Sequence, residues 1–466
     1  MTFEEAVGVL AGALRFGIHP SLDGIRALTR ALGCPQDAFR CVQVTGTNGK
    51  SSVTRMTAAL LRAHGLRVGA YTSPHLESYT ERIELDGVPV SETDFTAAVE
   101  AAHAAAGEWA AAGGAESPGR RDASPAFTEF ELLTAAALWL FRERGVQWAC
   151  LEVGMGGRWD ATSVVSPEVA VVTGVALDHT ERLGATVEEI ATDKAHIIKP
   201  GSIAVLGSGT PAVQAILRAR SAAEGAATVR VREADAPDVV ASDVRFHVTA
   251  RPDHPGGSLT LDVDGAFARY EHLVLEAPSY QAPNTATAVA AAEAALGRAL
   301  DEEVTRAALA AIRFAGRFEL VRHHPSVVLD GAHNPQAAAV LAEAIREAFP
   351  FAKPAIVLGV LADKDAAGIA EALAPVAGAI VVTQPDSPRA APAAELAVVV
   401  AAATGREPVV RPDLRSALDA AVEATGDAGV VVTGSLYTAG QARALLRTGR
   451  TPRNRSRHEA GRDLRS

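Results

Sequence analysis

The residues best suited to chemistry begin with Thr45-Gly46-Thr47-Asn48-Gly49-Lys50-Ser51-Ser52, directly after an apolar run that ends at Val44. An apolar strand, a glycine-containing turn and a helix that opens with a lysine and a hydroxyl residue form the layout of a phosphate-binding loop. Backbone N–H groups at a helix N-terminus and the helix dipole both favour an anion there. Lys50 would reach the terminal phosphates, and a serine hydroxyl would meet Mg²⁺. The stretch therefore predicts a nucleotide site, although Val44 replaces the first glycine of the common pattern.

Acidic and hydroxyl residues follow other short apolar segments, which are typical of parallel strands. Glu152 ends one such segment, and Ser73 and His75 follow another. Because the carboxyl ends of parallel strands meet at one edge of a sheet, we expect these side chains near the phosphate loop. Carboxylate and hydroxyl oxygens suit Mg²⁺, which also shares phosphate oxygens.

A histidine and a lysine complete this predicted site. Asp178-His179 come just past a further strand, and Lys194 lies near the end of a helix that starts with a Thr-x-x-Glu capping box. Taken singly, each residue also has an ordinary interpretation. Glu152 could cap a helix, His179 could be a buried core histidine, and Lys194 could be a surface lysine. Their convergence on one sheet edge favours a functional site.

Two α/β regions follow one another along the chain. Residues 1–297 alternate strands and helices, which predicts a P-loop ATPase-like parallel-sheet domain with extra antiparallel strands. Residues 298–446 repeat the alternation and predict a smaller Rossmann-like, doubly wound α/β domain, with a cleft between the two domains. Residues 447–466 are rich in arginine and poor in large apolar groups, so they predict a disordered basic tail.

The composition argues against several classes of protein. A net charge of -11 makes nucleic acid an unexpected partner. The 3 cysteines are too few for a disulfide framework or a metal cluster and fit a reducing compartment. No run approaches the ~18 apolar residues that span a membrane, and the acidic N-terminus is unlike a signal peptide. We therefore expect a cytoplasmic protein without a nucleic-acid or membrane partner.

The motifs, taken together, resemble those of the folate branch of the Mur ligase superfamily, the folylpolyglutamate synthases and dihydrofolate synthases. The resemblance extends from about Phe16 to Leu446. Its motifs are GTNGK at 46–50, TSPHL at 72–76, EVGMGGR at 152–158, LDH at 177–179, DKAHIIK at 193–199, GRFE at 316–319, DGAHNP at 330–335 and TGSLY at 433–437.

The resemblance implies roles for individual residues. ATP would be bound by Thr47, Asn48, Gly49, Lys50, Ser51, Ser52, Asn284, Arg317 and Asp330. Mg²⁺, at two sites, would be bound by Ser51, Ser73, Glu152, His179 and Lys194, the last as a carbamate that turns a cation into an anionic ligand. Substrates would be held by Thr72, Ser73, Pro74, His75 and Arg82 on the pteridine side and by His333 and Ser435 on the glutamate side. The residues implied in catalysis are Lys50, Lys194, His179 and Arg317.

The reaction that the resemblance implies is an ATP-dependent ligation in the cytoplasm by a monomer. ATP would phosphorylate the carboxylate of dihydropteroate or of a reduced folate, and the amine of L-glutamate would displace phosphate from the acyl phosphate. The sequence leaves open which acceptor is used and how long a glutamate chain is made. Because the family often has glycine at the position of Ser51, the sequence also leaves open whether Ser51 or Ser52 meets Mg²⁺.

Two other interpretations compete with this one. A Mur-type ligase for a cell-wall nucleotide would carry a UDP-binding domain before the phosphate loop, and the loop starts too early at residue 45 to leave room for it. A ligase acting on another, specialised carboxylate remains the alternative within the family. A nonenzymatic P-loop switch or dinucleotide sensor would not need Glu152, His179 and Lys194 together, and the loop lacks the G-x-G-x-x-G spacing.

Overall fold

The protein is described by a computed structural model that covers residues 1–13, 20–112, 127–237 and 239–448. It forms two compact units that interleave along the chain, whereas the sequence-based prediction places one boundary after residue 297. The first unit comprises Met1–His247, Asp262–Glu271 and Pro283–Leu309, and the second comprises Val248–Leu261, His272–Ala282 and Ala310–Ser466. Residues 449–466 of the predicted basic tail lie outside the described residues.

The larger sheet has its phosphate-loop strand in the middle. The strand order is β11-β10-β9-β8-β7-β6-β1-β5-β2-β3-β4. The strands are β1 (Arg40–Thr45), β2 (Val68–Tyr71), β3 (Ile83–Leu85), β4 (Val88–Pro89), β5 (Trp148–Glu152), β6 (Val169–Val172), β7 (Ile203–Leu206), β8 (Ala227–Glu233), β9 (Val244–Ala250), β10 (Ser258–Asp264) and β11 (Arg269–Glu276). β1 pairs in parallel with β5 and β6, and β2 pairs in parallel with β5. The carboxyl ends of these four strands therefore share one edge.

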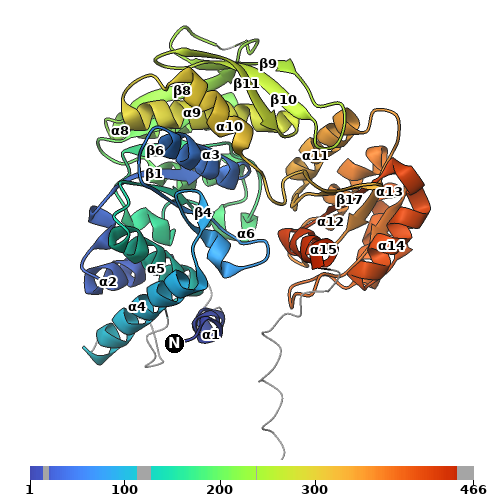
Figure 1. Ribbon diagram of the computed structural model, residues 1–466, viewed down its shortest axis with the longest axis horizontal. Helices are drawn as coiled ribbons and strands as arrows, with labels where there is room; N and C mark the ends of the chain where they lie inside the picture. Colours follow the sequence, from blue (N-terminus) through green and yellow to red (C-terminus); the bar gives the residue numbers. More distant parts are fainter. Residues whose placement is uncertain (14–19, 113–126, 238, 449–466) are drawn as a thin grey trace, which may run out of the picture. The chain divides into compact units, whose positions relative to one another are not determined.

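Helices pack on this sheet or on one another beside it, as Figure 1 shows for the blue to yellow part of the chain. They are α1 (Phe3–Ala13), α2 (Asp23–Ala31), α3 (Lys50–Ala63), α4 (Glu92–Ala111), α5 (Glu129–Glu143), α6 (Thr180–Leu183), α7 (Val187–Lys194), α8 (Pro211–Ala223), α9 (Ala282–Leu296) and α10 (Glu302–Ala311). A core of leucine, alanine and phenylalanine side chains joins α1, α2, α4 and α5 to β2 and β5. A second core packs α7 and α8 against β6 and β7.

Local sequence signals account for several of these elements. The hairpin of β3 and β4 turns at Asp86-Gly87, both with positive φ (49° and 79°), as expected of an Asp-Gly turn. Capping boxes start α5 at Thr128 and α7 at Thr186. The second of these confirms the predicted start of the helix that carries Lys194.

The second unit contains a smaller sheet with the order β12-β13-β17-β14-β15-β16. Its strands are β12 (Glu319–His323), β13 (Ser326–Leu329), β14 (Ala355–Leu358), β15 (Ile380–Val382), β16 (Val409–Val410) and β17 (Val430–Thr433). All neighbours are parallel except β12 and β13. The helices are α11 (Pro335–Ala348), α12 (Ala366–Leu373), α13 (Ala393–Thr404), α14 (Leu414–Thr425) and α15 (Leu436–Thr448). This alternation is the predicted doubly wound α/β arrangement.

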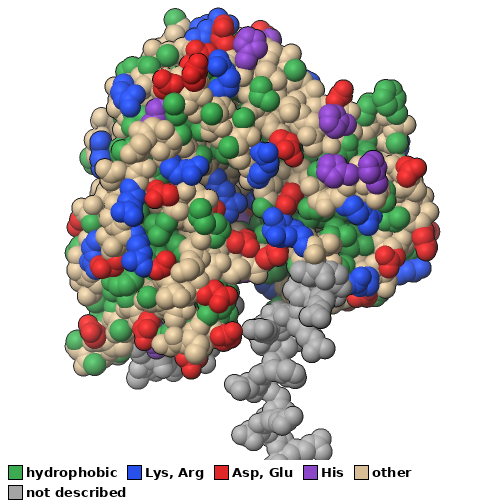
Figure 2. Space-filling model, in the orientation of Figure 1, with side chains coloured by type: hydrophobic (Ala, Val, Ile, Leu, Met, Phe, Trp, Pro, Cys, Tyr) green, Lys and Arg blue, Asp and Glu red, His purple; other side chains and the backbone are tan. Residues whose placement is uncertain are grey.

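The surface carries charges of both signs. Figure 2 shows basic and acidic side chains intermixed over the face in view. Of the helices within the described ranges, none has the length and apolar character needed to cross a membrane. The 3 cysteines, Cys34, Cys41 and Cys150, are free thiols.

Candidate functional site

The predicted phosphate loop joins β1 to α3, the helix that begins at Lys50. Gly46 and Gly49 have positive φ angles of 153° and 84°. A Cβ atom on Gly46 would lie 2.0 Å from Thr173 Oγ1, so no side chain fits there unless the segment after β6 moves. The loop thus needs glycine both for its turn and for this close approach.

Hydrogen bonds tie the loop to the segment that follows β6. The N–H of Thr47 donates to the Gly174 carbonyl at 2.7 Å, and the Thr173 hydroxyl donates to the Asn48 carbonyl at 2.7 Å. Thr47 Oγ1 contacts both the carbonyl and the N–H of Ala176, each at 3.0 Å. These contacts hold the backbone conformation that starts α3, where N–H groups and the helix dipole favour an anion.

Lys50 and Asn284 lie at the same turn. Lys50 Nζ donates to the carbonyls of Gly46 at 3.2 Å and Thr47 at 3.0 Å. Asn284, near the start of α9, covers Gly49 so closely that a Cβ atom there would lie 2.4 Å from Asn284 Oδ1. Lys50 and Asn284 are far apart in the sequence, and the structure brings them together. The family resemblance implies an ATP-binding role for both.

Glu152 joins two further predicted residues. Its side chain ends β5 and is only 1% exposed. Oε1 accepts a hydrogen bond from the Ser51 hydroxyl at 2.9 Å, and Oε2 accepts one from the N–H of Ser73 at 3.1 Å. A buried carboxylate thus meets the Ser51 hydroxyl and the backbone of Ser73 beside the phosphate loop. Carboxylate and hydroxyl oxygens suit Mg²⁺.

The two neighbouring serines of α3 have different surroundings. Ser52 is buried, at 4% exposed, among the residues by which α3 packs into the core. Ser51 is half-buried and reaches Glu152. The geometry therefore favours Ser51 as the hydroxyl beside the acidic group.

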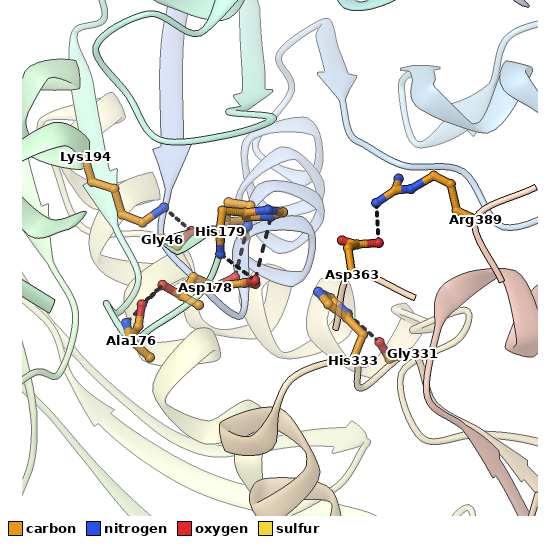
Figure 3. A network of polar contacts seen from close by, with 11 residues as sticks. Gly46, Ala176, Asp178, His179, Lys194, Gly331, His333, Asp363 and Arg389 are labelled. Atoms are coloured by element: carbon orange, nitrogen blue, oxygen red, sulfur yellow. Dashed lines mark hydrogen bonds and ion pairs between the residues drawn. The ribbon is translucent and has the colours of Figure 1, made fainter. Parts of the chain in front are cut away.

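Lys194 is the last residue of α7, and its side chain is buried. Figure 3 shows its amine pointing at the carbonyl of Gly46, to which Nζ donates at 2.8 Å. Burial, together with the nearby Lys50 cation, lowers the pKa of Lys194 to about 7. A lysine with this pKa is about half neutral at pH 7, whereas a surface lysine is almost fully charged.

His179 lies beside Asp178 just past β6. The backbone of His179 is left-handed (φ 51°), its N–H donates to Asp178 Oδ1 at 2.9 Å, and its ring Nε2 lies 3.9 Å from the same oxygen (Figure 3). The ring is 34% exposed. His179 is therefore not the buried core histidine of the ordinary interpretation.

The predicted pteridine-side residues form a compact group after β2. Arg82, which is buried, donates from Nε to His75 Nδ1 at 2.9 Å and lies over the Tyr79 ring at 4.9 Å. Arg82 also pairs with Glu129 at 3.4 Å. Burial and the Arg82 charge lower the pKa of His75 to about 3, so its imidazole stays neutral near pH 7.

In the second unit, Asp330 follows β13 and is buried. Its Oδ2 accepts hydrogen bonds from the Tyr280 hydroxyl at 2.9 Å and from the N–H of Phe318 at 2.8 Å, while Oδ1 accepts one from the N–H of Ala332 at 2.8 Å. Burial raises the pKa of Asp330, an effect that Arg317 opposes. Asp330 and Arg317 are thus electrostatic neighbours, as two ATP-contacting residues would be.

His333 and Ser435 follow the neighbouring strands β13 and β17. His333 Nδ1 lies 2.8 Å from the Gly331 carbonyl, which can only accept, so Nδ1 carries the proton (Figure 3). Ser435 Oγ accepts from the N–H of Thr438 at 3.0 Å and so caps the start of α15. Both residues therefore sit at the carboxyl edge of the smaller sheet, where ligands bind in such folds.

Two acidic residues were not singled out from the sequence. Glu129 pairs with Arg82, and Asp193 accepts a hydrogen bond from the N–H of Gly157 at 2.9 Å. Both lie on helices, where an acidic side chain is usually exposed to solvent, so nothing in the sequence indicated that either has a specific partner. Across the described part of the chain, no group of three or more His, Cys, Asp or Glu side chains is arranged to hold a metal by itself.

The fold and these contacts can be compared with known proteins. Two family models match, the Mur ligase middle domain over residues 44–292 and the Mur ligase glutamate ligase domain over residues 316–436. The dihydrofolate synthase/folylpolyglutamate synthase of Mycobacterium tuberculosis is 38% identical over 464 residues, which covers 93% of this chain and 91% of the relative.

Solved structures agree with that match. The Mycobacterium tuberculosis folylpolyglutamate synthase complexed with ADP has a TM-score of 0.86 and 37% identity, and the match covers 97% of this chain and 99% of that one. The Escherichia coli protein FolC in complex with DHPP and ADP has a TM-score of 0.81 and 30% identity, over 96% and 98% of the two chains.

The chain therefore belongs to the Mur ligase family, in its branch of folylpolyglutamate synthases and dihydrofolate synthases. This confirms the predicted fold class, a P-loop parallel-sheet domain followed by a smaller doubly wound α/β domain. It also confirms the predicted enzyme class, an ATP-dependent ligase.

Proposed function

We propose that this enzyme joins L-glutamate to the carboxylate of a folate-type acid, either dihydropteroate, which gives dihydrofolate, or tetrahydrofolate, which gives polyglutamates. The observation that carries the proposal is the meeting of Ser51, Ser73 and Glu152 beside the phosphate loop. The match over nearly the whole length of a relative named for both activities supports the same choice of substrates.

The proposed reaction has two steps. An oxygen of the acceptor carboxylate attacks the γ-phosphorus of ATP, the bond to the β-γ bridging oxygen breaks, and ADP leaves. The amine of glutamate then attacks the acyl carbon, phosphate leaves, and the nitrogen loses a proton to give the amide. Lys50 and Arg317 offset charge on the transferring phosphoryl group, which is the main way that proteins accelerate this chemistry.

The residues present fit Mg²⁺, which would neutralise phosphate charge and polarise the γ-phosphoryl group. We assign one site to the oxygens of Ser51, Ser73 and Glu152, because Glu152 accepts hydrogen bonds from the Ser51 hydroxyl and from the N–H of Ser73. We assign a second site to Glu152, His179 and Lys194. Both sites would combine few protein ligands with substrate phosphates, as is usual for Mg²⁺.

Carbamylation of Lys194 is the second part of the proposal. A neutral amine attacks CO₂, loses a proton and becomes a carbamate, so a cation is replaced by an anion. The burial that lowers the pKa of Lys194 to about 7 supplies the neutral amine. The modification would show as a carbamate carbonyl signal in NMR spectra of enzyme incubated with isotopically labelled bicarbonate.

The remaining residues bind substrates. Thr47, Asn48, Gly49, Asn284 and Asp330 contact ATP, with Ser52 supporting α3 from the core. The pteridine side of the acceptor meets Thr72, Ser73, Pro74, His75 and Arg82, and glutamate meets His333 and Ser435. The proposal also includes a monomeric enzyme in the cytoplasm, and light scattering of the purified protein tests the first of these.

The deciding experiment supplies Mg-ATP and L-glutamate with dihydropteroate in one tube and tetrahydrofolate in another, and follows phosphate release and product mass. A glutamate added to dihydropteroate establishes dihydrofolate synthase activity, and addition to tetrahydrofolate establishes polyglutamate synthesis. If neither acceptor gains mass while the protein binds Mg-ADP, the folate proposal is wrong and a different carboxylate is the acceptor.

A further inference from the structure

Three segments that are far apart in the sequence form a closed ring of hydrogen bonds around Lys194. Lys194 Nζ donates to the Gly46 carbonyl at 2.8 Å. The preceding residue of the phosphate strand, Thr45, donates from Oγ1 to the Gly156 carbonyl at 2.6 Å. The next N–H, that of Gly157, donates to Asp193 Oδ2 at 2.9 Å, and Asp193 is bonded covalently to Lys194. Three hydrogen bonds and three peptide links therefore close the ring.

The glycine turn in this ring lies directly on the end of α7. A Cβ atom on Gly157 would lie 2.7 Å from the Lys194 carbonyl oxygen and 3.0 Å from its Cα. One on Gly156, which has a φ of 68°, would lie 2.2 Å from Asp193 Oδ2. Gly157 is required by this close backbone approach, and Gly156 by its positive φ. The same segment, residues 152–157, begins with Glu152, so one stretch of backbone carries the acidic residue and contacts the end of the helix that bears Lys194.

Such a ring restricts where the lysine amine can lie. A lysine side chain has several rotatable bonds, and its direction depends on the rotation of the helix end that carries it. Asp193 fixes that helix end to the glycine turn, and Thr45 fixes the turn to the strand that opens the phosphate loop. The Gly46 carbonyl then receives the amine. A carbamate nitrogen keeps one N–H, so the same hydrogen bond survives modification.

We propose that Thr45 and Asp193 are positioning residues that hold Lys194 against the phosphate loop. The inference rests on the proposed function of Lys194 in the ligase reaction. Neither residue touches the reacting atoms, and both act through Lys194. Residues that orient a catalytic group from behind are commonly worth about tenfold to a hundredfold in activity.

The test is a double-mutant cycle in kcat, measured with whichever acceptor the enzyme uses. Asp193→Ala and Thr45→Val should each lower kcat about tenfold to a hundredfold. In a Lys194→Ala background neither change should lower kcat further, because the group being positioned is gone. Asp193→Asn and Thr45→Ser keep an acceptor and a hydroxyl and should stay within about threefold of the parent. Glu188→Gln, an exposed change on the same helix, is the matched control.

Amide hydrogen exchange gives a readout that does not depend on activity. Loss of the acceptor in Asp193→Ala should speed exchange in the peptide around Gly157 about tenfold, and Glu188→Gln should leave it unchanged. Unchanged exchange, or an effect of Asp193→Ala on kcat that persists in the Lys194→Ala background, overturns the proposal. A wild-type enzyme that ligates no acceptor would instead overturn the proposed function, and the exchange experiment would still decide whether the ring exists.

Discussion

The two sheets of the molecule both carry candidate residues at the carboxyl ends of parallel strands, but they use different chemistry there. In the first unit the groups are mainly charged. Lys50 and Lys194 both donate to the Gly46 carbonyl, and the buried Glu152 ends β5, the strand that pairs with β1. In the second unit, the ends of β14 and β17 carry close backbone contacts and the neutral hydroxyls of Ser435 and Thr438, and Asp330 is a buried acid after β13.

Glycines make the second edge compact. A Cβ atom on Gly434, which has a φ of 101°, would lie 2.6 Å from the Gly359 carbonyl oxygen. The Thr438 hydroxyl donates to the same carbonyl at 2.8 Å and contacts Ser435 Oγ at 2.7 Å. The ends of β14 and β17 are thereby locked together around the start of α15.

This difference suggests a division of labour. Concentrated charge in a poorly solvated place suits phosphoryl transfer, in which charge must be offset in the transition state. A closely packed backbone with neutral hydroxyls suits the binding and orientation of an amino acid. Changes at the phosphate-loop edge of the first unit should therefore act mainly on kcat, and a change at Ser435 mainly on the KM for glutamate.

The largest expected effect is that of Lys194→Ala. Removing a buried group that faces the phosphate loop should lower kcat by about a hundredfold to a thousandfold, as for other groups that act on transition-state charge. The KM for glutamate should change little. Steady-state kinetics with varied ATP and glutamate measure both. Lys353→Ala removes an exposed lysine of the second unit and should leave kcat unchanged. If Lys194→Ala turns over at close to the parental rate, Lys194 does not contribute to the chemical step, and the contrast between the two edges is wrong.

A smaller effect should separate the two serines of α3. Ser51→Ala removes the hydroxyl that donates to Glu152 and should lower kcat about tenfold to a hundredfold and raise the Mg²⁺ concentration needed for half-maximal rate. Ser52→Ala changes a buried position away from that carboxylate and should keep kcat within about threefold. A magnesium titration of both variants measures the contrast. The opposite ranking would assign the metal to Ser52.

At the second edge, Ser435→Ala should raise the KM for glutamate about tenfold, by roughly the 1.4 kcal/mol of one lost hydrogen bond, while kcat changes little. The loss of the α15 cap should also lower the free energy of unfolding by about 1 kcal/mol. Thr210→Ala removes the equivalent cap of α8 in the first unit and controls for that loss. If both variants raise the KM equally, stability rather than glutamate contact is responsible.

The pH dependence of stability should also reflect the buried amine of Lys194. Lys194 has a pKa of about 7 in the folded state and of about 10.4 when unfolded, so between these values the unfolded chain binds more protons. Stability should therefore rise with pH above pH 7, with a contribution from this group of up to about 1.4 kcal/mol per pH unit. Urea unfolding at several pH values in bicarbonate-free buffer measures the slope. The slope should be smaller in Lys194→Met, and equal slopes would mean that the amine is not desolvated.

Much of this architecture could be predicted from local sequence. The Asp86-Gly87 turn and the capping box at Thr186 depend only on neighbouring residues, so both can be predicted from the sequence. Alternating apolar runs and helical patterns indicated two α/β regions, and glycines with Lys50 indicated the phosphate loop. The candidate residues were found because each follows a strand whose end must lie at a shared edge.

Other features were decided only by the tertiary structure. Ser51 rather than Ser52 faces Glu152 because the packing of α3 against the sheet turns Ser52 into the core. The partner of Arg82, Glu129, is an ordinary helix-start acid in the sequence. Asp193 is an ordinary acidic residue near the end of a short helix in the sequence, and only the fold brings Gly157 to it. Each of these contacts joins residues well separated along the chain, and no local pattern encodes which side chains meet.

The sequence by itself thus determined the family, the two kinds of domain and the residue types of the site, because motifs and periodicity are properties of neighbouring residues. The tertiary structure alone determined the ring that joins Thr45, Gly157 and Asp193 around Lys194, since its hydrogen bonds depend on how separate strands and a helix pack. The same packing desolvates the lysine and lowers its pKa, so the chemistry of that amine is a property of the fold.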